Sequence, residues 1–216
     1  MFYALQAVAA AASLYTTEFY QNILNWDAGI LLWVQENLRN DVLTPIMKVI
    51  THSVDGGIFW ILLTVLLLII PKTRKMGLCS MIALACSLLV CNLALKNIFE
   101  RIRPYEVIAG LELIVEKADD PSFPSGHTCA SFASSVALLF AAEKKQRIFA
   151  IVAVIYAFLV GFTRIYVGIH YPTDVIAAAF VATAFAIPAA IFGKKLYDFL
   201  AAKYMKKKAD KKKTEA

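Results

Sequence analysis

The sequence predicts an all-α integral membrane protein, a polytopic bundle of five to six transmembrane helices with an N-terminal amphipathic helix at the membrane interface. Of its 216 residues, 60% are hydrophobic and only 18% are charged, and the mean hydropathy is +0.64. Soluble domains typically contain about 45–50% apolar and about 25% charged residues. A soluble chain of this length cannot bury such an excess of apolar side chains, because much of its surface stays exposed.

Uncharged apolar runs mark the predicted transmembrane helices. There are five of them: Gly56–Pro71, Met76–Leu95, Pro121–Ala142, Ile148–Thr163 and Val175–Gly193. The second, third and fifth runs are long enough for a bilayer, which needs about 20 residues. The first and fourth reach that length if each is extended by one helical turn. Pro188 in the last run is tolerated in a membrane helix.

The N-terminal part is predicted to lie at the membrane surface. Apolar residues from Ile30 to Leu38 recur at helical spacing opposite polar ones, which indicates an interfacial amphipathic helix or a helix packed on its neighbours. A short helix is expected from Asp41 to about Ile50, and residues 1–25 could form a sixth span. The chain then divides into interfacial helices (1–50), a transmembrane core (51–195) and a basic cytoplasmic tail (196–216).

The basic residues predict the topology. Fifteen of the 22 lie in three alternate places: Lys72, Arg74 and Lys75; Lys144, Lys145 and Arg147; and nine lysines from Lys194 to Lys213. The positive-inside rule places these loops and the C-terminus in the cytoplasm. Residues 96–127 and 164–174 then lie at the extracytoplasmic face. No aromatic or glycine residues are interleaved with the lysines, so nucleic-acid binding is not predicted.

The four cysteines are predicted to be small apolar packing residues. Cys79, Cys86, Cys91 and Cys129 all lie in or at the edge of apolar runs, and none has the spacing of a metal site.

The first candidate motif is LKNIFERIRPYE. Lys96 and Arg103 are seven residues apart, which puts them on one face of a helix that ends near Arg103, because Pro104 favours an extended residue before it. Lys96 could simply reach the membrane interface. Two cations on one face also suit an anion, and a guanidinium matches the geometry of a phosphate.

The second motif, PSFPSGH, interrupts the apolar sequence. Ser125 is predicted to be the N-cap of the third span, with Gly126 and His127 in its first turn. A helix N-terminus offers free N–H groups to an anion, and the histidine can donate a proton. Taken alone, the motif is better explained by an ordinary helix cap and a surface histidine.

The third motif, TRIYVGIHYPTD, combines a cation, a histidine and a carboxylate. Pro172 suits the first turn of the fifth helix, and Asp174 can hold one nitrogen of His170 while the other acts as a nucleophile. Arg164 adds a third cation. The three motifs together favour phosphoryl transfer without a metal or other cofactor, because no acidic pairs at ligand spacing accompany the three histidines.

These three motifs, in this order, resemble those of the type-2 phosphatidic acid phosphatase family: Lys-x6-Arg-Pro, Pro-Ser-Gly-His and Ser-Arg-x5-His-x3-Asp. The resemblance covers about residues 50–195. It implies that His170 is the nucleophile, Asp174 its orienting partner and His127 the general acid. It also implies that the phosphate is bound by Lys96, Arg103, Ser125, Gly126 and Arg164. Thr163 stands where the family usually has serine, and His52 matches no motif.

The resemblance implies a lipid phosphate or diphosphate substrate with its tail in the membrane. As a small chain of bacterial appearance, it resembles the undecaprenyl-diphosphate phosphatases of this family, which implies a location in the bacterial cell (inner) membrane. Phosphatidylglycerophosphate or phosphatidate phosphatase is the alternative, and a non-catalytic lipid-binding or transport protein is more remote. A vanadate-dependent haloperoxidase would have similar anion-binding residues, but those enzymes are soluble and much larger.

Overall fold

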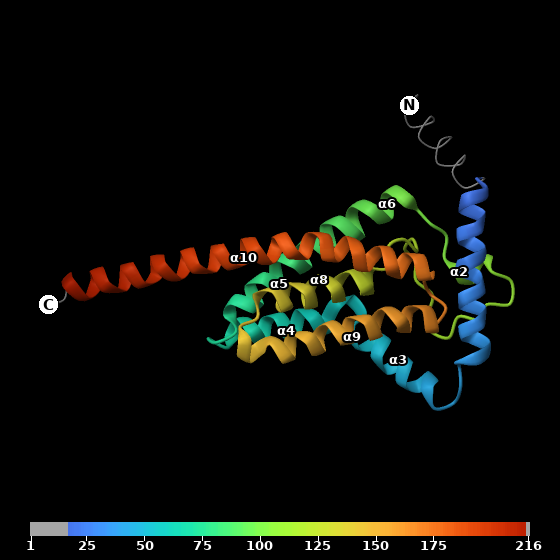
Figure 1. The fold of residues 1–216 in the computed structure, drawn as a ribbon, viewed down its shortest axis with the longest axis horizontal. Coiled ribbons are helices and arrows are strands. Elements are labelled where there is room, and N and C mark those ends of the chain that lie inside the picture. The colour runs from blue at the N-terminus through green and yellow to red at the C-terminus, as the bar shows by residue number, and fades with distance from the viewer. Residues whose placement is uncertain (1–16, 215–216) are drawn as a thin grey trace, which may run out of the picture.

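The structure is a computed structural model that describes residues 17–214. Within this range the chain is helical and contains no β-strand, which confirms the predicted all-α class. The bundle in Figure 1 is formed by α4 (Ile58–Ile69), α5 (Arg74–Ser87), α8 (Gly126–Ala141), α9 (Arg147–Tyr166) and α10 (Pro172–Thr214). Pro172 begins α10, as predicted.

The helix lengths support a membrane protein but leave the number of spans open. Three helical segments are long and apolar enough to cross a membrane, namely Arg74–Val107, Lys144–Tyr166 and Pro172–Asp210. A bent pair, Leu43–Ser53 with Asp55–Ile69, could act as a fourth. The apolar helix α8 has only 16 residues, because residues 121–125 of the predicted span belong to the preceding loop. The count of five to six spans stays a prediction, and residues 1–16 lie outside the described range.

Helix α8 is the centre of the bundle and packs against α5, α9 and α10. The side chains at these contacts are small: Ala133, Ala137, Ala157 and Ala182 are fully buried. Small residues let membrane helices approach closely. Large apolar side chains point outward instead, and Leu66, Ile155, Phe158 and Phe180 are among those exposed. A surface with this many exposed apolar side chains suits a lipid environment.

The connection after α5 differs from the prediction. The helix continues through a π-helical segment, η2 (Leu88–Leu95), into α6 (Lys96–Phe99), and it ends at Glu100, which has a left-handed backbone with φ of 43°. The helix predicted to end near Arg103 therefore ends earlier, at Phe99, whereas the predicted extended conformation of Arg103 is confirmed. Arg103 is extended and precedes α7 (Pro104–Val107).

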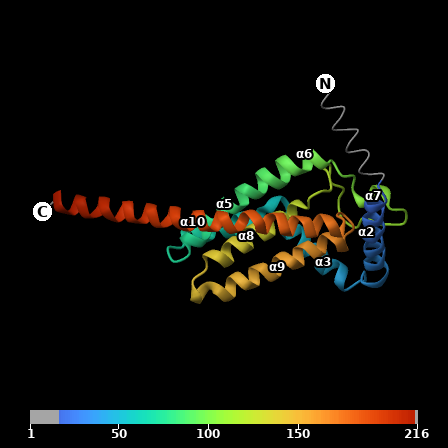
Figure 2. The ribbon, with the colours of Figure 1, turned by 45° about the horizontal axis from the view of Figure 1, so that its top comes forward.

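The N-terminal helices lie across the bundle. Helix α2 (Glu18–Asn37) crosses one end of it, and α3 (Leu43–Ser53) leads from α2 toward α4 through a short 3₁₀ turn, η1 (Asp55–Gly57) (Figures 1 and 2). Trp26 and Trp33 are exposed on α2. At the other end, α10 extends beyond the bundle, running without a break through the predicted tail boundary at residue 196 (Figure 1).

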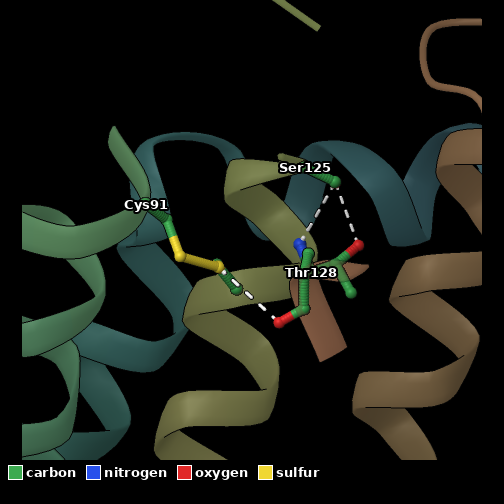
Figure 3. Close-up of a disulfide and its surroundings, with 5 residues drawn as sticks. Cys91, Ser125 and Thr128 are labelled. Atoms are coloured by element: carbon green, nitrogen blue, oxygen red, sulfur yellow. Dashed lines mark hydrogen bonds between the residues drawn. A yellow bond between two sulfur atoms is a disulfide. The ribbon is translucent and has the colours of Figure 1, made fainter. Parts of the chain in front are cut away.

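Two cysteines form a disulfide, which corrects the prediction that all four are packing residues. Cys91 in η2 is bonded to Cys129 in α8, with their Cα atoms 6.7 Å apart (Figure 3). The disulfide could not be predicted from the sequence, because both cysteines lie in apolar runs and are separated by 38 positions. Cys79 is free and fully buried, and Cys86 is free.

Candidate active site

A cavity of about 490 Å³ brings the three motifs together. Six of the eight residues predicted for the site line it: Lys96, Arg103, Gly126, His127, Arg164 and His170. The other two, Ser125 and Asp174, are fully buried behind the lining. Thr163, in the position of the family serine, does not line the cavity, and its hydroxyl donates to Val160 O at 2.6 Å within α9.

Two of the cations meet at a carboxylate that the sequence analysis missed. Asp120 pairs with Lys96 Nζ, and its Oδ1 lies 2.5 Å from Arg103 Nη2. Lys96 and Arg103 thus converge as predicted, although the loop after Phe99, and not a common helical face, brings them together. Partial burial disfavours the charge on Asp120, but the two cations outweigh that effect and lower its pKa to about 2. The cationic pair therefore already holds an anionic group.

The third cation, Arg164, lies in the last turn of α9, inside the protein. Its Nη1 donates to Thr51 Oγ1 at 2.5 Å, and its Nε is buried without a hydrogen-bond partner in the described part of the chain. A buried unpaired donor on a cation is costly and is satisfied by an acceptor oxygen. Because Arg164 lines the cavity, a phosphate there would meet this requirement.

His170 lies in the turn between α9 and α10, with its two nitrogens in different surroundings. Nδ1 lies 3.5 Å from Asp174 Oδ2, and Nε2 lies 3.4 Å from Arg103 Nη1. Ser122 donates to the same carboxylate oxygen at 2.5 Å. Burial lowers the pKa of His170 to about 3, with Arg103 acting in the same direction and Asp174 opposing it. The imidazole is therefore neutral at physiological pH, as a nucleophile must be.

A tight turn sets the position of His170. Gly168 has a φ of +81°, a backbone conformation that residues other than glycine rarely adopt. A Cβ atom there would also come within 3.0 Å of Glu112 O. The turn lets His170 follow Arg164 by only six residues while both face the cavity.

His127 has its own acidic partner, which the sequence analysis also missed. Its Nε2 donates to Asp55 Oδ1 at 2.8 Å, and Asp55 Oδ2 lies 2.9 Å from Nδ1 of His52. Nδ1 of His127 has no hydrogen bond to any described residue. His52 therefore adjoins the site through Asp55, at the exposed side of the cluster.

The start of α8 matches the prediction. Ser125 is the N-cap, and its hydroxyl accepts hydrogen bonds from Thr128 N at 3.4 Å and from Thr128 Oγ1 at 2.9 Å (Figure 3). Gly126 follows and lines the cavity, where a Cβ atom would come within 2.9 Å of Asn92 Oδ1. The positive end of the α8 dipole therefore opens on the same space as the cations.

Most of the remaining wall of the cavity is apolar. It includes Val54, Ile61, Leu84, Leu88 and Ala130, together with the polar residues Ser87 and Asn92. Among the described residues there is no group of three or more His, Cys, Asp or Glu side chains that could hold a metal ion. The site thus combines a cationic region, two histidines and an apolar wall.

These features define a helical membrane protein with a cavity that is lined by three cationic side chains and a buried histidine. The chain belongs to the PAP2 superfamily, whose model matches residues 74–198. This confirms the family that the three motifs indicated, and with it the predicted phosphatase class.

Curated relatives point in the same direction. The chain is 36% identical over 118 residues to an undecaprenyl-diphosphatase of Sulfolobus acidocaldarius, a match that covers 55% of each chain. It is 35% identical over 144 residues to the undecaprenyl-diphosphatase BcrC of Bacillus subtilis, covering 67% of this chain and 72% of that one. The chain therefore spans about half the length of the first relative and nearly three quarters of the second.

A solved structure shares the fold over most of the chain. It is a transmembrane PAP2 type phosphatidylglycerolphosphate phosphatase from Bacillus subtilis, with a TM-score of 0.65 and 25% sequence identity. The similarity covers 90% of this chain and 92% of that one.

Proposed function

We propose that this protein hydrolyses a polyprenyl diphosphate, of the undecaprenyl type, at the extracytoplasmic face of the membrane. The observation that carries the proposal is the two-part cavity, in which Lys96, Arg103 and Arg164 face the same space as Ile61 and Leu88. A lipid phosphate has both a multiply charged head and an apolar chain, so it matches both parts. Two relatives named as undecaprenyl-diphosphatases support this substrate.

In the first step, His170 attacks the terminal phosphorus with Nε2. The P–N bond forms as the bond to the bridging oxygen breaks, and His127 gives that oxygen a proton from Nδ1. Lys96, Arg103 and Arg164 stabilise the charge on the equatorial oxygens. Asp174 stabilises the proton on Nδ1 of His170, while Asp55 stabilises the protonated His127.

In the second step, water attacks the phosphohistidine. His127, now neutral, removes a proton from the water as the new P–O bond forms, and the P–N bond breaks. Inorganic phosphate leaves, and His127 is protonated again for the next turnover. Each histidine thus ends the cycle in its starting protonation state.

The location of the basic residues supports the proposed orientation. In Figure 1 the α4–α5 and α8–α9 connections lie at the end of the bundle opposite α2. Both connections carry basic residues, and Gln146 of the second donates to Lys72 O of the first at 2.8 Å. Under the positive-inside rule that end faces the cytoplasm, which leaves His170 at the extracytoplasmic face.

A second candidate substrate is phosphatidylglycerophosphate. The solved relative that shares the fold over 92% of its length is a phosphatidylglycerolphosphate phosphatase. Hydrolysis of that lipid uses the same histidines and cations, since only the leaving group changes from a phosphate to an alcohol.

A panel of lipids tests the substrate. The purified protein is assayed for phosphate release in mixed micelles with undecaprenyl diphosphate, phosphatidylglycerophosphate or phosphatidate, beside the His170→Asn variant as a blank. The highest kcat/KM is expected with undecaprenyl diphosphate. Cleavage of phosphatidylglycerophosphate with none of the polyprenyl lipid would replace the first candidate by the second.

A further inference from the structure

Arg101 lies between two buried carboxylates on different helices. Its Nη2 is 2.8 Å from Asp27 Oδ2 on α2, and its Nη1 is 2.6 Å from Asp174 Oδ1 on α10. Both carboxylates are fully buried, and Arg101 is 8% exposed. Neither Asp27 nor Arg101 belongs to the residues that the three motifs assign to the reaction.

Thr173 adds a second connection between α2 and the first turn of α10. Its backbone N–H donates to Asp27 Oδ1 at 2.9 Å, and its hydroxyl donates to Asp27 Oδ2 at 2.5 Å. The same hydroxyl accepts a hydrogen bond from Arg101 Nη1 at 2.7 Å. Asp27 therefore caps the helix that carries Asp174 at the residue next to it.

Two further contacts connect Arg101 and Asp174 with the residue next to His170. The Arg101 guanidinium lies 3.8 Å from the ring centroid of Tyr171, and the Tyr171 backbone N–H donates to Asp174 Oδ2 at 3.0 Å. Oδ1 of Asp174 thus pairs with Arg101. Oδ2 accepts hydrogen bonds from the Tyr171 N–H and the Ser122 hydroxyl, and it also lies beside Nδ1 of His170. The Asp174 carboxylate is fixed from both oxygens.

The network also sets the net charge beside His170. A buried carboxylate is stable in its charged form only when it is paired and hydrogen-bonded. One guanidinium shared by two carboxylates leaves a net negative charge beside Nδ1 of His170. That charge favours a proton on Nδ1 and therefore leaves the Nε2 lone pair free to attack phosphorus.

We propose that Asp27 is a positioning residue for the reaction: through Arg101 and Thr173, helix α2 holds Asp174, and thereby His170, in the attacking geometry. The inference rests on the proposed roles of His170 and Asp174. It gives α2 a part in catalysis in addition to its place at the membrane interface.

Two variants and a matched control test the proposal. Asp27→Asn removes the charge with little change in shape, and Thr173→Val removes only the bridging hydroxyl. Glu36→Gln neutralises a carboxylate at an exposed position of the same helix. The lipid that the wild type cleaves fastest is used, with kcat, KM, inhibition by inorganic phosphate and the thermal midpoint in detergent as readouts.

We expect Asp27→Asn to lower kcat by about 100-fold, the cost of misplacing a reacting group by about 1 Å. KM and the inhibition constant of phosphate should stay near the wild-type values, because the cations that bind phosphate are untouched. Thr173→Val should lower kcat in the same way but less, and Glu36→Gln should leave it unchanged. If Asp27→Asn does not fold, Thr173→Val decides alone.

Wild-type kcat in either folded variant would overturn the proposal, as would a loss of phosphate binding in parallel with kcat. Failure of the proposed function gives a different pattern. If His170→Asn keeps its activity, the mechanism itself is wrong. If His170→Asn is inactive while Asp27→Asn and Thr173→Val match the wild type, only the role of the network is wrong.

Discussion

Nη1 of Arg103 lies 3.4 Å from Nε2 of His170, although the two residues are 67 positions apart in the chain. Arg103 is further held by Ile169 O, to which the same Nη1 donates at 3.0 Å. The guanidinium therefore sits beside the nitrogen that is proposed to attack phosphorus. A phosphate bound by Arg103 would have its phosphorus within reach of His170 without movement of the backbone.

Arg103→Lys should lower kcat/KM by about 100-fold. Lysine keeps the charge, but it cannot bind two phosphate oxygens in the planar arrangement of a guanidinium, and losing one preorganised donor costs about 10²–10³ in rate. Phosphate release from micellar substrate measures the effect. Arg147→Lys, at the exposed first residue of α9, is the control, and equal activity of the two variants would contradict the role of Arg103.

Asp120→Asn should strengthen the binding of phosphate. The carboxylate occupies Lys96 and Arg103, so a substrate phosphate must displace it. The Asp120 side chain is 52% exposed, so its ion pairs with the two cations are expected to weaken phosphate binding by no more than about 1 kcal/mol. This corresponds to about a fivefold change in affinity. The inhibition constant of inorganic phosphate measures this change. A weaker binding of phosphate in the variant would mean that Asp120 organises the cations instead of competing for them.

His127→Ala should affect poor leaving groups more than good ones. General acid catalysis contributes about 10²–10⁴ in rate, and it matters most when an alkoxide would otherwise leave. The loss with phosphatidate should therefore exceed the loss with p-nitrophenyl phosphate, whose leaving group needs no proton. Equal losses on both substrates would contradict the role of His127 as the acid.

Acid should destabilise the protein through His170. Burial lowers the pKa of His170 to about 3 from the ordinary 6.5, so the folded state binds fewer protons than the unfolded state between these values. The contribution of His170 is complete above pH 6.5 and is lost as the pH falls toward 3. The thermal midpoint of the wild type should fall more between pH 7 and 4.5 than that of His170→Asn. An equal fall would show that His170 does not drive the change.

Removing the disulfide should destabilise the fold. The bond between Cys91 and Cys129 closes a loop of 38 residues, which corresponds to about 4 kcal/mol in the chain-entropy account. Cys91→Ala should lower the thermal midpoint under oxidising conditions, and a reductant should bring the wild type close to it. Cys86→Ala is the control, since Cys86 is free. A wild type that is insensitive to reductant would contradict a structural role for this bond.

The sequence predicted those parts of the site that depend on local chemistry. Ser125 and Pro172 start helices where cap and proline preferences place them, and Asp174 in the first turn of α10 reaches back to His170, four residues before it. Six of the eight predicted residues line one cavity.

What the sequence could not predict are contacts made by unremarkable residues from distant segments. Asp27, Asp55 and Asp120 are ordinary acidic residues in the sequence, and only the tertiary fold brings each to a cation or a histidine. Cys91 and Cys129 likewise have the sequence pattern of packing residues, and only the fold, which places η2 beside α8, brings them close enough to form a disulfide. The helix end at Phe99 follows a π-helical segment and a left-handed Glu100, and the apolar run gives no signal for either of them.

Trapping the phosphoenzyme tests the central claim most directly. Undecaprenyl diphosphate labelled with ³²P in its terminal phosphate is mixed with excess enzyme, quenched in alkali and digested. The label is expected on the peptide that contains His170, as an alkali-stable and acid-labile adduct, and it should be absent from His170→Asn. Label that persists in His170→Asn, or a wild type that releases phosphate in the same assay without ever becoming labelled, would contradict a phosphohistidine intermediate at this residue.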